Sequence, residues 1–186
     1  MEADWEVEIG ADAPVIDACW TGFVDLRSSP ELVRTLEEVN HLPALAEALS
    51  RLNAKSSSLW TAKCDVWDVL DSDQIDPYEL NANPETARHA SSCYIDLLPR
   101  SDQQWMEPEM AISWCVDTCK RLGSIGLRNC RVDLIVRQAI VIEPRIDLGV
   151  TAYLTACGPT ADEAVETLQN SLDKFIDILA HSSTVK

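Results

Sequence analysis

The chain has 186 residues, a length typical of one domain and sufficient to bury a substantial hydrophobic core. It is 46% hydrophobic and 25% charged, with only 9 Pro and 6 Gly, so the composition excludes a disordered, collagen-like or low-complexity chain. The formal net charge of −16 disfavours nucleic acid and anionic membranes as partners, because both carry dense negative charge. We therefore expect a single domain over residues 1–186 with no nucleic-acid and no membrane partner.

The N-terminal residues and the cysteines bear on the compartment. Residues 1–6 are acidic, whereas a secretory signal needs a basic flank followed by an apolar stretch, and no run of about 18 apolar residues follows. The cysteines are odd in number and none forms a C-x-x-C pair, which is typical of reduced thiols. We expect a cytoplasmic protein in which all seven cysteines are reduced: Cys19, Cys64, Cys93, Cys115, Cys119, Cys130 and Cys157.

The first predicted elements are a strand and two helices. Apolar and polar residues alternate over 15–27, and a period of two predicts a half-buried strand. The sequence Ser-Ser-Pro-Glu at 28–31 then supplies a cap, a first-turn proline and a first-turn acid for a helix. Its apolar positions lie within 32–39, and those of a second helix within 42–52.

A second strand begins at Leu59, where the two-residue period returns. We expect Trp60 in the core, together with Trp20 of the first strand, whereas Trp67 shares the polar parity and faces outward. Trp67 and Trp105, which lies in a polar loop, are therefore the tryptophans expected to make surface contacts. The inward residues of this second strand are Trp60, Ala62, Cys64 and Val66, and the outward ones are Thr61, Lys63 and Asp65.

Residues 68–88 form an acidic, irregular excursion that joins the two halves of the chain. Residues 71–76 resemble the start of a calcium-binding loop. Ile75, Asp76 and Ala82, however, stand where a ligand, a glycine and a glutamate are required, so we expect no calcium site.

The second half predicts a strand over 93–97, a helix from Pro108 to Gly123, a hairpin over 129–157 and a long final helix. The final helix is indicated by the capping box at 160–163 and an apolar stripe that follows it. With the hairpin turn centred on Pro144, the expected pairs are Arg137 with Thr151, Ile135 with Tyr153 and Asp133 with Thr155, in a register that can slip by two residues.

This order of elements defines an α+β fold that resembles the ferredoxin-like plan of two β-α-β units, with an added C-terminal strand and long helix. The expected sheet is mostly antiparallel and carries the helices on one face. The resemblance is architectural and implies no activity.

The other sheet face, which no helix covers, is the candidate site. Its expected outward side chains are polar with a few aromatics, and they include a patch of Arg, Tyr and Thr. Arg, Trp and Tyr are the residues that most often anchor interfaces, and Arg also binds anions. The residues predicted to bind a ligand or partner are Arg131, Arg137, Tyr153, Tyr94, Trp67 and Asp96.

Two groups of residues are considered as candidate metal sites. Asp65, Asp96 and Asp133 on neighbouring strands would be a divalent-metal site, but outward carboxylates on antiparallel sheets are usually solvated or paired with arginine. Cys115 and Cys119 share a helix face but have no second ligand pair at zinc spacing. We predict no metal and no cofactor, and the catalytic residues, if the protein is an enzyme, stay unknown.

Charge is unevenly distributed along the chain. Residues 1–38 carry a strong acidic excess, whereas residues 120–137 are basic overall, with five basic residues against Asp133. We expect a non-enzymatic binding or assembly protein that self-associates, as a dimer, and acts through the exposed sheet face. The alternative is an anion sensor or an enzyme that uses the Arg/Tyr/Asp residues of the same face.

Overall fold

The computed structural model describes residues 1–18, 20–70, 75–101, 105–142 and 145–181. Within these residues the chain is an α+β protein with a single sheet, whose strand order is β1-β5-β6-β4-β3, and the short β2 also pairs with β5. The strands are β1 (Glu2–Glu8), β2 (Ile16–Asp17), β3 (Leu59–Val69), β4 (His89–Pro99), β5 (Cys130–Ile142) and β6 (Arg145–Gly158). The helices are the 3-10 helix η1 (Pro30–Thr35), α1 (Glu37–His41), α2 (Ala44–Asn53), α3 (Pro108–Gly123) and α4 (Ala161–His181).

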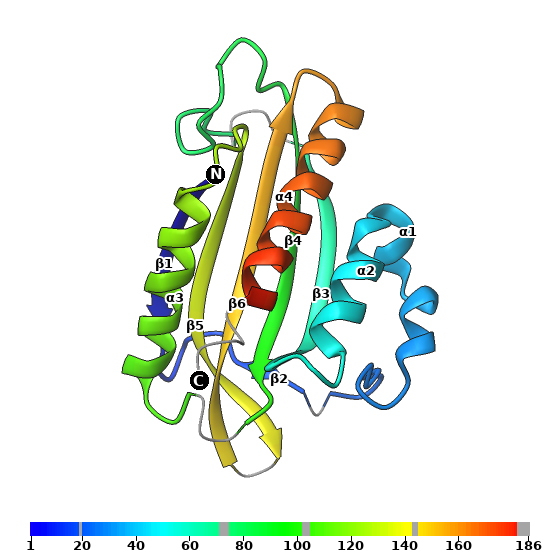
Figure 1. Ribbon diagram of the computed structural model, residues 1–186, viewed down its shortest axis with the longest axis vertical. Coiled ribbons are helices and arrows are strands. Elements are labelled where there is room, and N and C mark those ends of the chain that lie inside the picture. The colour runs from blue at the N-terminus through cyan, green and yellow to red at the C-terminus, as the bar shows by residue number, and fades with distance from the viewer. Residues whose placement is uncertain (19, 71–74, 102–104, 143–144, 182–186) are drawn as a thin grey trace.

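The main helices α2, α3 and α4 lie on one face of the sheet, as expected (Figure 1). Their apolar stripes and the sheet residues that face them form the principal core, in which Phe175, Leu172 and Leu134 are fully buried. The long final helix is confirmed, and its predicted cap is present, because the amide of Glu163 donates to the Thr160 hydroxyl at 3.2 Å. No helix in the described part of the chain is long and apolar enough to cross a membrane.

The strand order does not confirm the ferredoxin-like plan. β4 and β5 are both antiparallel to β6, which lies between them, so β4-α3-β5 is a parallel crossover. β1 is parallel to β5, whereas β3 is antiparallel to β4, so β1 and β3 run in opposite directions at opposite edges of the sheet (Figure 1). The first half of the chain is therefore not a β-α-β unit.

The strand predicted over 15–27 is wrong except at β2. The chain enters the sheet through β1, an acidic segment for which no element was predicted. Beyond β2 the backbone turns, with Gly22 at φ +101° and an ion pair between Asp25 and Arg27. Trp20 is 39% exposed, so the expectation of a buried Trp20 is also wrong.

A β-bulge in β3 changes which side chains face the helices. The pairing with β4 shifts between Thr61 and Cys64, so one extra residue stands in β3. Before the bulge, Trp60 and Ala62 face away from the helices, and after it Cys64 faces the helical core. The prediction that Trp60, Ala62, Cys64 and Val66 share one face is therefore wrong.

The β5–β6 hairpin is confirmed, in a register two residues away from the expected one. Arg137 pairs with Gly149, Ile135 with Thr151, and Asp133 with Tyr153. The hairpin closes with Ile142 opposite Arg145, which accounts for one residue of the difference, and the irregularity between Ile140 and Ile142 accounts for the other. Of the turn predicted over 143–145, residues 143–144 lie outside the described residues, and Arg145 begins β6.

Three further expectations concern the acidic excursion, the cysteines and Trp105. Residues 75–88 form turns without a helix or strand, whereas 71–74, the start of the calcium-like loop, lie outside the described residues. Six cysteines are free thiols, and Cys19 lies outside the described residues. Trp105 is 4% exposed and stacks edge-on against Trp114, so it belongs to the core and not to the surface predicted for it.

Candidate binding face

The sheet face opposite the helices, here called the open face, is partly covered at each end. At one end Ile16, Ala18 and Phe23 pack against sheet residues, and together they form a small second core. The sheet residues of this core are Trp60, Ala62, Leu98 and Ala139. At the other end Leu80 of the acidic excursion packs on Ala90 and Cys157. Along β4 the open-face residues run from Ala90 through Ser92, Tyr94 and Asp96 to Leu98, so the middle three lie between the two covers.

Three aromatic side chains occupy this middle region, and we call them the aromatic cluster. Trp67 of β3, Tyr94 of β4 and Tyr153 of β6 come from three adjacent strands. Their ring centroids are 6.3 Å apart for Trp67 and Tyr94, 6.4 Å for Trp67 and Tyr153, and 5.7 Å for the two tyrosines. Trp67 is 39% exposed, and both tyrosines are half-buried. The cluster is therefore a fixed aromatic surface that solvent reaches.

A chain of hydrogen bonds runs beside the aromatic cluster. The Thr151 hydroxyl donates to Asp96 Oδ1 at 2.6 Å and accepts from Arg137 Nη1 at 3.1 Å. The same Nη1 lies 3.4 Å from the Tyr153 hydroxyl, and Arg137 Nε and Nη2 both donate to Glu8 Oε2, at 3.0 and 2.7 Å. Arg137 is thus bound on its donor edges by groups of the same chain.

The buried position of Asp96 changes its acidity. Asp96 is only 6% exposed, and desolvation raises the pKa of its carboxyl above the usual range, against the opposing effects of the Thr151 hydrogen bond and the Arg137 charge. Burial, together with the charges of Asp96 and Asp65, raises the pKa of Tyr94 to about 12. The Tyr94 phenol therefore stays neutral at any physiological pH.

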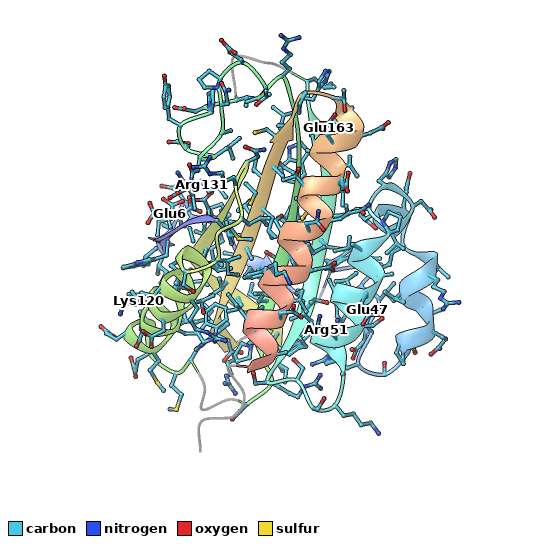
Figure 2. All side chains as sticks on the ribbon, turned by 45° about the horizontal axis from the view of Figure 1, so that its top comes forward. Glu6, Glu47, Arg51, Lys120, Arg131 and Glu163 are labelled. Carbon is cyan, nitrogen blue, oxygen red and sulfur yellow. The ribbon has the colours of Figure 1, made fainter. Side chains whose placement is uncertain are left out.

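Arg131 lies apart from this group. Its guanidinium contacts Asp133 at 2.7 Å, and Asp4 and Glu79 at 3.7 Å each. It lines a cavity of about 140 Å³ beside Leu80 of the excursion. In Figure 2, Arg131 lies with Glu6 on the β1 side, while the labelled residues of α2 lie on the other side.

Of the six predicted site residues, five therefore come together: Arg137, Tyr153, Tyr94, Trp67 and Asp96. The burial of Asp96 was not foreseen.

A cavity of about 390 Å³ next to the aromatic cluster was not predicted from the sequence. It lies between the β3 bulge and the segment that follows β2, and its size is within the range of small-molecule sites. Tyr94 and Asp65 connect it to the aromatic cluster, and the Lys63 ammonium lies 5.4 Å from the Trp20 ring centroid at its wall. The apolar lining comprises Val24, Leu26, Leu36, Leu49 and Ala62. The bulge residues Thr61 to Cys64 form part of its wall, and the sequence contains no clear signal for the bulge.

The charges on the open face are acidic in balance. Arg131 and Arg137, the two arginines predicted to bind a ligand, are already paired with carboxylates, so neither presents a free guanidinium to an anion. Asp65 is exposed, and among the described residues it has no ion-pair partner. The β1 register adds a row of acids to the same face: Glu2, Asp4, Glu6 and Glu8. The predicted Arg/Tyr/Thr patch is therefore largely neutralised from within.

Chemistry at the cysteines is disfavoured by burial. Desolvation raises the pKa of Cys64 to about 12, and that of Cys119 to about 11. Within 1–18, 20–70, 75–101, 105–142 and 145–181, no group of three or more His, Cys, Asp or Glu is placed to hold a metal ion.

No family model, curated protein or solved structure matches this chain.

Proposed function

We propose that the chain is a non-enzymatic binding or assembly protein that acts through its open face. The observation that carries this proposal is the aromatic cluster, which is held on three hydrogen-bonded strands and left accessible between two covers. Trp and Tyr anchor interfaces because they bury a large apolar area at a small cost in side-chain entropy. A sheet that holds Trp67 and both tyrosines in fixed positions supplies such anchors in advance.

Self-association as a dimer is part of the proposal. β1 and β3 are the two edges of the sheet, and an unpaired strand edge can pair with a second copy. Val7 of β1 is 41% exposed, which supports contact at that edge. We also propose a cytoplasmic location, which the six free thiols support.

A selection from a random peptide library tests the binding role. Peptides are selected on the immobilised full chain and then measured against the variants Trp67→Ala and Trp5→Ala. Trp5 is the matched control, because its exposure is similar and the β1 register places it on the helical side of the sheet. We expect selected peptides to lose at least about tenfold in affinity with Trp67→Ala and to be unaffected by Trp5→Ala. The proposal fails if no peptide is selected, or if the selected peptides bind Trp67→Ala and Trp5→Ala with equal affinity.

A small-molecule site, as a sensor or an enzyme, is the second candidate, and two observations favour it. The pKa of Asp96 is raised by burial. Tyr94, on the same strand and the same sheet face as Asp96, lines the 390 Å³ cavity. The pairing of Arg137 with Glu8 counts against an anion as the ligand. Native mass spectrometry of protein purified without added ligand tests this candidate: extra mass on the 20.6 kDa chain would favour it, and a clean mass would disfavour it.

A further inference from the structure

We propose that the aromatic cluster receives a lysine or arginine side chain from a basic segment of a partner protein. This inference rests on the proposed binding role of the open face and specifies the chemistry of the partner. It depends on three observations: the aromatic surface itself, the unpaired acid beside it, and the charge of the rest of the face.

The aromatic surface is suited to a cation. The face of an indole or phenol ring carries partial negative charge, so a cation within about 6 Å of the ring centroid is attracted to it. The described part of the chain contains this contact three times: Arg27 over Trp60 at 3.6 Å, Lys63 over Trp20 at 5.4 Å and Arg137 over Tyr153 at 5.7 Å. Among the described residues, no cation lies over Trp67 or Tyr94. These two rings remain for a cation from outside.

A counter-charge lies next to those rings. Asp65 pairs with Tyr94 in the β3–β4 register, so both side chains project from the same face of the sheet. The carboxylate of Asp65 is exposed, and it accepts a hydrogen bond from the amide of Val66 at 2.7 Å. A lysine or arginine on the aromatic cluster would gain the ring contact and an ion pair with Asp65 together.

The remainder of the face attracts a basic segment and repels an acidic one. The acids of β1 outnumber the two arginines that face them, and Arg131 and Arg137 are already bound by carboxylates. The whole chain carries −16, which steers a basic partner toward it and disfavours contact with a second copy at this face. Charge complementarity therefore points to a basic segment and not to a second copy of this chain.

Isothermal titration calorimetry with defined peptides tests the inference. The probes are three blocked eight-residue peptides in which Gly alternates with Lys, with Gln or with Glu. They are titrated into the full chain and into Trp67→Ala, Asp65→Asn and the control Trp5→Ala. We expect the Lys peptide alone to bind, with affinity falling about fivefold for each of the first two variants and unchanged for the control.

Each other outcome overturns the inference. If the Gln peptide binds as tightly as the Lys peptide, the face binds without regard to charge. That result excludes a cation as the recognised group and leaves the proposed binding role intact. Binding of the Lys peptide that neither Trp67→Ala nor Asp65→Asn weakens would assign it to the net charge alone. A Lys peptide that does not bind contradicts the inference, and the random-library selection then decides separately whether the face binds anything. Circular dichroism of each variant verifies that it is folded, and Asp65→Asn changes only the charge.

Discussion

Asp96 illustrates how a side chain that looks ordinary in the sequence acquires a distinct role from its surroundings. Its position on the open face follows from strand alternation, but its burial depends on Arg137 and Thr151, which come from other strands. The carboxyl is held by one short hydrogen bond, and desolvation raises its pKa despite that bond. Its ionised form is therefore less favourable in the folded chain than in the unfolded one.

Substitution of Asp96 by Asn is expected to change the pH dependence of stability. Because the folded pKa is raised, the folded chain holds more protons than the unfolded one above the ordinary value of about 3.9, so the wild type loses stability as pH rises through that window. Asn accepts the Thr151 hydrogen bond but does not titrate. The melting temperature of Asp96→Asn minus that of the wild type should therefore increase from about pH 4 to pH 7. A difference that decreases with pH would show that the Arg137 charge outweighs desolvation.

The two deeply buried tryptophans should differ in the cost of removing their indole N–H. Trp60 Nε1 donates to the Pro99 carbonyl at 3.1 Å, whereas Trp105 Nε1 has no hydrogen-bond acceptor among the described residues. Trp60→Phe should therefore lower the free energy of unfolding by about 1 kcal/mol more than Trp105→Phe, because only Trp60→Phe removes a hydrogen bond. Urea denaturation of both variants measures the difference. Equal losses, or a larger loss for Trp105→Phe, would contradict this account.

At the scale of elements, the joint between α2 and β3 positions the β-bulge. Asn53, at the end of α2, donates through its amide to the Leu49 carbonyl at 2.9 Å and to the Thr61 hydroxyl at 2.8 Å. The side-chain oxygen Oδ1 of Asn53 accepts a hydrogen bond from the backbone amide of Thr61 at 3.2 Å. Arg100 completes the joint by donating to the carbonyls of Asn53 and Ala54, at the helix end where carbonyls otherwise lack partners.

Removal of the Asn53 amide should destabilise the chain strongly. Asn53 is 5% exposed, so Asn53→Ala leaves the Thr61 amide and hydroxyl buried without partners, and we expect a loss of about 2–4 kcal/mol in the free energy of unfolding. Ser50→Ala on the same helix is the control, since its exposed hydroxyl only donates to the Ala46 carbonyl, and should cost less than about 0.5 kcal/mol. Chemical denaturation distinguishes the two. A loss for Asn53→Ala no larger than that for Ser50→Ala would remove this joint from the account.

The elements that the sequence predicts correctly are those specified by local signals. The final helix combines a capping box with an apolar stripe, and the β5–β6 hairpin combines two alternating runs with a short turn. The alternation of acids with Ala3, Trp5 and Val7 was also present for β1, but it was interpreted as an acidic terminus.

The missed features depend on contacts between distant segments. The β3 bulge has no fixed signature, and it leaves Trp60 and Ala62 on the face opposite to the one predicted for them. Most of the candidate site was predictable, because Tyr94, Asp96 and Tyr153 share one sheet face by alternation. The pairing of Arg137 with Glu8 was not, since it requires β1 to lie beside β5.

For the whole molecule, the net charge of −16 opposes association of two copies. If a dimer forms at the edge strand β1, the acids of the two copies approach one another, and like charges on paired strands are destabilising. Salt shortens the screening length from about 10 Å at 0.1 M to about 3 Å at 1 M, so the dimer fraction should rise with salt. Sedimentation equilibrium measures that fraction. A dimer that dissociates with salt would indicate that opposite charges hold it, and a monomer at every salt concentration would remove the dimer from the proposal.

The indole N–H resonance of Trp67 gives the most direct test of the open face as a binding surface for basic segments. The six tryptophans are labelled with nitrogen-15, their indole signals are assigned by single substitutions, and the Gly-Lys peptide is added stepwise. We predict a saturable shift of the Trp67 signal, while the signals of Trp5 and Trp114, on the helical side, stay in place. Shifts at Trp5 or Trp114 without a shift at Trp67 would contradict the proposal, as would the absence of any shift.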